Sequence, residues 1–173
     1  MKVVAVRGPS NSGKTETIIA LLRELRRRGF SVVTAKDVHQ AGFSIDTPGK
    51  DSARLGEAGG EAVVIRAEGE TSFVYRRRFP AEEIVTSVAA DFLVVEGFRD
   101  LSCANLACAR ELDELRRQID EQTIAISGVV ASSLVTYEGV PAVSALSEVE
   151  KLADVVEAGA TEVGPPPSSQ AGA

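Results

Sequence analysis

The chain has 173 residues, 44% of them hydrophobic, and a net charge of −6. This length supports one compact domain with its own core, and the acidic balance argues against broad electrostatic binding to nucleic acid or a membrane surface. No apolar run approaches the roughly 20 residues that a membrane helix needs. The chain opens on a strand-like run without a signal segment, so we expect a cytoplasmic protein.

Apolar runs alternate along the chain with segments whose apolar positions recur at helical intervals. In chain order, the apolar and β-rich runs predict strands at residues 3–6, 31–35, 62–67, 71–76, 92–95, 123–127 and 140–144. The other segments predict one helix that carries residues 18–25 and ends at Gly29, and further helices at residues 52–58, 80–89, 109–118 and 147–157. Ser147 is the expected cap of the last helix.

Residues 8–15 carry the P-loop pattern GxxxxGK[ST] between a predicted strand and a predicted helix. Glycines let the backbone wrap closely around phosphate, and the amino end of the helix adds its positive dipole. Lys14 would neutralise the β- and γ-phosphates, and the Thr15 hydroxyl would bind Mg²⁺. The expected nucleotide-binding residues are Gly8, Pro9, Ser10, Asn11, Ser12, Gly13, Lys14, Thr15 and Glu16.

This order of elements predicts an α/β fold, a P-loop NTPase three-layer sandwich with a mostly parallel sheet and helices on both faces. The turn at residues 68–70 predicts that the strands around it form an antiparallel hairpin extension of that sheet. We expect a nucleotide-binding domain over residues 1–160. A flexible tail over residues 161–173 should follow, because three consecutive prolines and small polar residues leave little to bury.

Two acidic positions are candidates for binding the metal. Glu96 ends the most apolar run of the chain, and the carboxyl end of a parallel strand is where ligands bind in such sheets. Asp46 opens a polar segment in which Pro48-Gly49 requires a turn. The alternatives are an ordinary acid at a strand end for Glu96 and a solvated surface turn for Asp46.

Together these segments resemble the molybdopterin-guanine dinucleotide biosynthesis protein B (MobB) family. The loop at residues 8–15, Lys36 after the second strand, and residues 46–54, 58–60 and 91–99 follow in the family's order. The resemblance covers about residues 1–160. Its most specific part is the Gly-Lys-Asp-Ser segment joined to the later Glu-Gly-Phe.

The resemblance implies a GTP-binding adaptor, at most a weak Mg²⁺-dependent GTPase, that is usually a homodimer. In that family the partner guanylyltransferase joins GMP to molybdopterin. In related P-loop proteins a threonine, an aspartate and a glutamate serve Mg²⁺, and by motif these are Thr15, Asp46 and Glu96. Lys36 corresponds to a lysine that faces the terminal phosphate or the second substrate. The catalytic candidates are therefore Lys14, Lys36 and Glu96.

A second anionic site, for the pterin phosphate or the partner enzyme, is the other expectation. Its candidates are Lys36, His39, Lys50, Asp51, Ser52 and Arg54. The family usually has Lys-His after the second strand. Here Asp37 follows Lys36 and only His39 remains nearby, which weakens any role that depends on histidine.

The sequence contains no clear guanine-reading motif. Residues 34–37 imitate the Thr-Lys-x-Asp pattern but lie on the phosphate side, and the later loop at residues 127–131 offers backbone groups without an acid. Guanine preference therefore depends on the resemblance. Two alternatives stay open: a P-loop small-molecule kinase that uses ATP, and a nucleotide-gated scaffold without catalysis.

Overall fold

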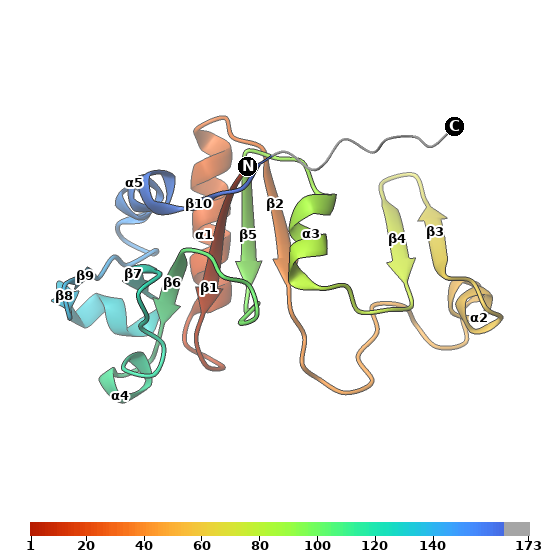
Figure 1. Ribbon diagram of the computed structural model, residues 1–173, viewed down its shortest axis with the longest axis horizontal. Helices are drawn as coiled ribbons and strands as arrows, with labels where there is room; N and C mark the ends of the chain where they lie inside the picture. Colours follow the sequence, from red (N-terminus) through yellow and green to blue (C-terminus); the bar gives the residue numbers. More distant parts are fainter. Residues whose placement is uncertain (165–173) are drawn as a thin grey trace. The chain divides into compact units, whose positions relative to one another are not determined.

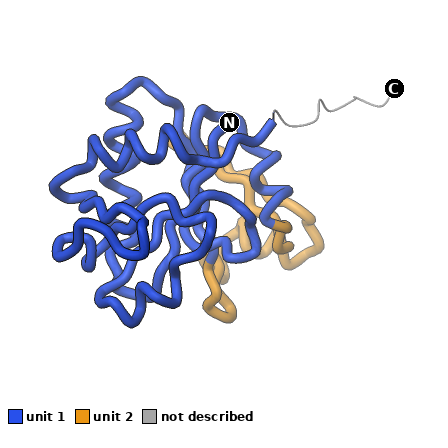
Figure 2. The backbone as a smooth tube through the Cα atoms, turned by 60° about the vertical axis from the view of Figure 1, so that its left-hand side comes forward, with its two compact units in different colours: residues 1–37, 81–173 blue, residues 38–80 orange. Residues whose placement is uncertain are grey.

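The computed structural model describes residues 1–164. The chain divides into two compact units (Figure 2). The first contains residues 1–37 and the described residues from 81 onward, and the second contains residues 38–80. None of the described helices combines the length and the apolar character that crossing a membrane requires.

The first unit is built on a sheet whose strands follow the order β2-β5-β1-β6-β7 (Figure 1). All pairs along this path are parallel. A further strand, β10, pairs antiparallel with the amino half of β1. The strands are β1 (Lys2–Arg7), β2 (Val32–Lys36), β5 (Phe92–Glu96), β6 (Asn105–Cys108), β7 (Thr123–Ser127) and β10 (Thr161–Glu162).

Helices cover both faces of this sheet, which confirms the predicted three-layer arrangement. Side chains of β1 alternate between the two faces, as in any strand. Val4 and Val6 pack with α1 (Lys14–Arg27) and α5 (Val149–Gly159), whereas Val3 and Ala5 pack with α3 (Ala81–Ser87). Because both faces are covered, the central strands are continuous apolar runs.

Shorter elements lie at the β7 side of the sheet. They are α4 (Leu112–Leu115), η1 (Val129–Ser133), β8 (Thr136–Tyr137) and β9 (Val140–Pro141). Leu115, Val130 and Ala131 pack with Ile126 of β7 in a small apolar cluster. This packing holds in place the loop that leads from β7 into η1, which lies next to the P-loop.

The second unit contains α2 (Asp51–Glu57) and a hairpin of β3 (Ala62–Arg66) and β4 (Thr71–Tyr75). The hairpin is antiparallel as predicted. Its two strands form a sheet of their own, so the expectation that they extend the central sheet is corrected. The burial pattern explains this: most residues of both strands are exposed, whereas strands of the central sheet are buried on both faces.

Several boundaries in the second half of the chain differ from prediction. The strand β6 was not predicted, and the helix expected at residues 109–118 is reduced to the short α4. The strand expected at residues 140–144 is reduced to β9, and α5 begins after Glu148 without a side-chain cap, so Ser147 is not its cap.

The predicted tail also begins too early. Thr161–Glu162 form β10, and the Val163 amide donates to the Met1 carbonyl oxygen. The prediction for residues 165–173 lies outside the described residues.

Candidate functional site

The carboxyl ends of the parallel strands bring the predicted phosphate and metal residues to one edge of the sheet. β1 leads into the P-loop, β2 ends at Lys36, and β5 ends at Glu96. The register places Val6, Lys36 and Glu96 level with one another across three adjacent strands. Residues far apart in sequence therefore meet where open α/β sheets bind their ligands.

Close backbone approach fixes the shape of the P-loop. Gly8 has φ 153°, and a Cβ atom there would overlap the carbonyl oxygen of Cys108 at the end of β6. Ser12 is fully buried, and among the described residues its hydroxyl has no hydrogen-bond partner. The loop is thus a tight cradle that only glycine permits at its first position.

The loop after β7 packs closely against the P-loop at the carbonyl oxygen of Ser12, and we call this contact the clamp. Gly128 has φ 72°, and a Cβ atom there would overlap the carbonyl oxygen of Ser12. The Val129 amide donates to the same oxygen at 3.1 Å. Sequence reasoning noted the backbone groups of this loop but missed the clamp. The glycine at the end of an apolar strand was the available signal.

A small polar cluster lies beneath the start of α1. The Thr17 and Ser127 hydroxyl oxygens are 3.3 Å apart, and the Cys108 sulfur lies 3.8 Å from the Thr17 hydroxyl. Burial raises the pKa of the Cys108 thiol to about 12. The thiol therefore stays protonated and is no nucleophile at neutral pH. Its role is to join α1, β6 and β7 under the phosphate loop.

The three predicted catalytic residues belong to the first unit, and two of them are in direct contact. Lys36 Nζ lies 3.0 Å from Glu96 Oε1, and the Thr15 hydroxyl lies 3.4 Å from Glu96 Oε2. Glu96 is 14% exposed and Lys36 58%. Lys14 Nζ donates to the Pro9 carbonyl oxygen at 2.6 Å, so its ammonium group lies against the loop backbone.

Thr15 and Glu96 fit a magnesium ion that arrives with a nucleotide. Their hydroxyl and carboxylate oxygens are the hard ligands that Mg²⁺ prefers, and Mg²⁺ is usually held by one or two such groups together with phosphates. Within residues 1–164, no group of three or more His, Cys, Asp or Glu side chains forms a metal cage by itself. The donor set therefore suits a phosphate-bound ion.

Asp46, the third predicted metal ligand, belongs to the second unit. Its side chain is 5% exposed, accepts a hydrogen bond from the Ser52 hydroxyl at 2.8 Å, and pairs with Arg76 at 2.9 Å. Sequence reasoning did not select Arg76. In the chain, α2 and the hairpin lie between Asp46 and Arg76, so no local sequence pattern connects these two residues.

The remaining candidates for the second anionic site also lie in the second unit. Lys50 precedes α2 as its N-cap, and Asp51 pairs with Arg54 one turn later at 3.4 Å. His39 lies in the segment before this helix, where it is exposed. A cavity of about 530 Å³ is lined by Lys50 and Ser52 together with apolar hairpin residues.

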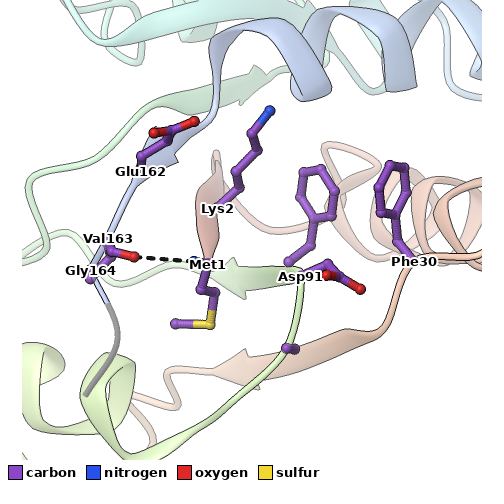
Figure 3. A pocket seen from close by; sticks show the side chains of 9 residues that line it. Met1, Lys2, Phe30, Asp91, Glu162, Val163 and Gly164 are labelled. Atoms are coloured by element: carbon purple, nitrogen blue, oxygen red, sulfur yellow. Dashed lines mark hydrogen bonds between the residues drawn. The ribbon is translucent and has the colours of Figure 1, made fainter. Parts of the chain in front are cut away.

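The first unit has two cavities of interest. The larger, about 580 Å³, lies at the amino ends of the strands beside Lys2, Asp91 and Phe92 (Figure 3). Glu162 and Val163 of the last described segment close it on one side. It is at the opposite end of the strands from the P-loop, so it takes no part in phosphate chemistry. The smaller, about 280 Å³, adjoins the P-loop at Gly13.

Comparison with known proteins identifies the family to which this geometry belongs. The family model of molybdopterin guanine dinucleotide synthesis protein B matches residues 3–131. No curated protein sequence matches the chain significantly.

Solved structures of this family share the fold. A crystal structure of Bacillus subtilis MobB matches with a TM-score of 0.76 at 24% identity, covering 94% of this chain and all of that one. A MobB homolog from Bacillus stearothermophilus matches with a TM-score of 0.67 at 19% identity, covering 91% of this chain and 99% of that one. At these identities the likeness establishes the fold.

Proposed function

The chain belongs to the molybdopterin guanine dinucleotide synthesis protein B family, and from this premise we propose that it binds Mg²⁺–GTP and assists the attachment of GMP to molybdopterin. The family gives the coarser statement directly: the chain is a P-loop nucleotide binder with a role in molybdenum cofactor biosynthesis. The guanine nucleotide, the ion and the adaptor role are the proposal.

One observation carries the proposal. The P-loop, Thr15, Glu96 and Lys36 converge at the carboxyl edge of the sheet, with Thr15 and Lys36 both in contact with the Glu96 carboxylate. A phosphate cradle beside a hydroxyl, a carboxylate and an ammonium group has the parts that a Mg²⁺–triphosphate site requires. The clamp from Gly128 preorganises the cradle, so little order has to be created on binding.

In the proposed site, positively charged and N–H groups bind the phosphates, and oxygen ligands bind the ion. Backbone N–H groups of residues 8–15 and the Lys14 ammonium hold the phosphates, while Thr15 and Glu96 hold the ion. Magnesium, when bound, neutralises phosphate charge and fixes the phosphates in place. Lys36, which now pairs with Glu96, would be the ammonium group available to face the terminal phosphate if Glu96 held the ion. Because its carboxylate is committed either to Thr15 and Lys36 or to the ion, Glu96 is not proposed as a base for water, and we expect hydrolysis to be slow.

Asp46 is retained as the third proposed metal ligand. To serve the ion, its carboxylate must exchange its ion pair with Arg76 for the metal. We expect Asp46→Asn to weaken the Mg²⁺-dependent part of GTP affinity about tenfold, because the ion loses a charged ligand. The control is Glu57→Gln, an exposed acid at the end of α2, and titration with and without Mg²⁺ measures both. Equal affinities for the two variants would remove Asp46 from the metal site.

The second unit supplies the proposed second anionic site and dimer surface. His39, Lys50, Asp51, Ser52 and Arg54 are its groups proposed to meet the pterin phosphate or the guanylyltransferase. Lys36, the remaining candidate, belongs to the first unit. Several large apolar side chains of this unit are exposed, which supports a homodimer or partner contact. A cytoplasmic location completes the proposal.

Equilibrium titration with GTP, ATP and their diphosphates, with and without Mg²⁺, tests the function. We expect metal-dependent GTP binding that Lys14→Ala reduces at least a hundredfold, since the variant loses a charged phosphate contact in a closed cradle. Lys151→Ala, on the exposed side of α5, is the matched control.

The same titration separates the alternatives. Equal or tighter binding of ATP would contradict the GTP proposal and favour a kinase, which an added phosphate acceptor would then reveal. If Lys14→Ala still supported attachment of GMP to molybdopterin by the partner enzyme, nucleotide binding would not be the basis of the assistance.

A further inference from the structure

The smaller cavity of the first unit opens directly beside the phosphate cradle. Its lining includes Gly13 and Glu16 at the start of α1, Val129 and Ser132 of η1, and Leu146 of the segment before α5. Gly13 and Glu16 are also residues of the predicted nucleotide-binding loop. A group held here is therefore continuous with phosphates held by the P-loop.

Two exposed apolar side chains on its lining have no role in the core. Leu146 is 81% exposed and Val129 is 52% exposed, and neither belongs to an apolar cluster of the fold. The cavity of about 280 Å³ is close to the lower end of the roughly 300–1,000 Å³ that ligand sites usually have. It suits one heteroaromatic ring with its sugar, whose faces these side chains would cover.

Among the described residues that line this cavity, one is charged. Glu16 is that residue, and the other polar side chains on the lining are hydroxyls of Thr17, Ser132 and Ser144. A carboxylate is an acceptor only. Guanine presents two adjacent donors, N1–H and the N2 amino group, which match a carboxylate. Adenine presents a lone pair at N1, which repels one.

We propose that this cavity holds the guanine nucleoside of the P-loop nucleotide, with the ring packed on Val129 and Leu146 and with Glu16 accepting from N1–H and the N2 amino group. The inference rests on the proposed nucleotide binding and adds the groups that select the base. Glu16 would supply the acid that the loop after β7 lacks, because residues of both segments line the cavity.

The first experiment separates the contribution of the base to binding affinity from that of the phosphates. Wild type, Leu146→Ser and Val135→Ser are titrated with Mg²⁺–GTP and with Mg²⁺–tripolyphosphate. Val135 is the matched control because it is 83% exposed and does not line the cavity. We expect Leu146→Ser to lower the affinity for GTP about tenfold, because one apolar side chain is lost from the contact with the base. The affinity for tripolyphosphate should stay unchanged.

Three results would overturn the inference in distinguishable ways. Unchanged GTP affinity in Leu146→Ser removes the base from this cavity. Equal wild-type affinities for GTP and tripolyphosphate show that the base makes no contact, while the phosphate site stands. Absence of binding to either ligand overturns the proposed function together with this inference.

The second experiment tests the reading of the base by Glu16. Glu16→Gln keeps one acceptor and gains a donor, so it matches the edge of adenine better than that of guanine. We expect the affinity of this variant for GTP to fall about tenfold and its affinity for ATP to rise. Its affinity for ITP, which lacks the N2 amino group, should fall less than that for GTP. Glu121→Gln, an exposed acid outside the cavity, is the control. An equal change for GTP and ATP would assign Glu16 a merely structural role.

Discussion

The two units of the molecule differ in how far their apolar side chains are buried. In the first unit, β1, β5 and β6 are buried almost throughout, and helices close the sheet on both sides. In the second unit, residues 38–80, only Ala53 and Val63 are buried hydrophobic residues. Its exposed large side chains include Phe43, Ile45 and Phe73. The first unit thus has an apolar core of its own, whereas the second leaves most of its large apolar side chains exposed.

The two units are held together by different kinds of contact. Backbone contacts between distant loops hold the phosphate cradle, as Gly128 shows. The second unit is held by a hairpin, a short helix and a few ion pairs such as that of Asp46 with Arg76. Segments with few buried apolar contacts open with small free energies and are the ones that move on binding.

The largest effect is expected from Gly128→Ala in the first unit. The added methyl group would overlap the Ser12 carbonyl oxygen at a left-handed φ, so the clamp cannot close. We expect the free energy of unfolding to fall by about 3 kcal/mol or more, with loss of nucleotide binding. Urea denaturation and GTP titration measure the two effects.

Gly139→Ala is the matched control for this change. Gly139 has φ 82°, but a methyl group there meets nothing within 4 Å. We expect it to cost only about 1 kcal/mol from backbone strain and to leave GTP binding intact. Equal losses for the two variants would show that strain alone, and not the clamp, determines the stability of the cradle.

The second prediction concerns the surface of the second unit. Phe73→Glu places a charge on the exposed hairpin, where Phe73 is 64% exposed. We expect the proposed homodimer to dissociate about tenfold or more readily, because burying an unpaired charge at an interface is strongly unfavourable. Sedimentation at several concentrations measures this, with Val135→Glu in the first unit as the control. An unchanged oligomeric state would remove this face from the dimer interface.

The first unit and its phosphate site could largely be predicted from sequence. Strands such as β5 are buried on both faces and therefore read as apolar runs, and the P-loop is a local pattern with a local cause. The strand β6 was missed because Asn105-Leu106-Ala107-Cys108 contains one strong apolar side chain, and its burial comes from β1 and β7. Tertiary pairing overrode a weak local signal.

Three contacts between distant residues could not be predicted. Nothing near Ser12 indicates that Gly128 will accommodate its carbonyl oxygen, and nothing near Glu16 indicates that Leu146 will share its cavity. The same holds for the ion pair between Asp46 and Arg76. These contacts depend on strand order and register, which a local pattern does not contain.

The smallest effect is expected at the seam between α1 and α5, and it should be confined to the first unit. Glu24 is buried at this seam and accepts hydrogen bonds from Arg27 and Arg28, each at 2.7 Å. Arg28 also pairs with Asp154 and Glu157 of α5. Hydrogen bonds from Arg27, then those from Arg28, lower the pKa of Glu24 to about 2.

A lowered pKa in the folded state fixes the sign of the pH dependence. The contribution of Glu24 to stability is complete above its unfolded pKa of about 4.3 and is lost as the pH falls toward 2. Glu24→Gln should therefore be less stable than wild type at pH 7, and the difference should shrink between about pH 4.5 and pH 2. Urea midpoints at stepped pH measure it, with the exposed Glu82→Gln as the control. A difference that stays constant down to pH 2 would mean that the variant loses packing at the seam and not the charge pair.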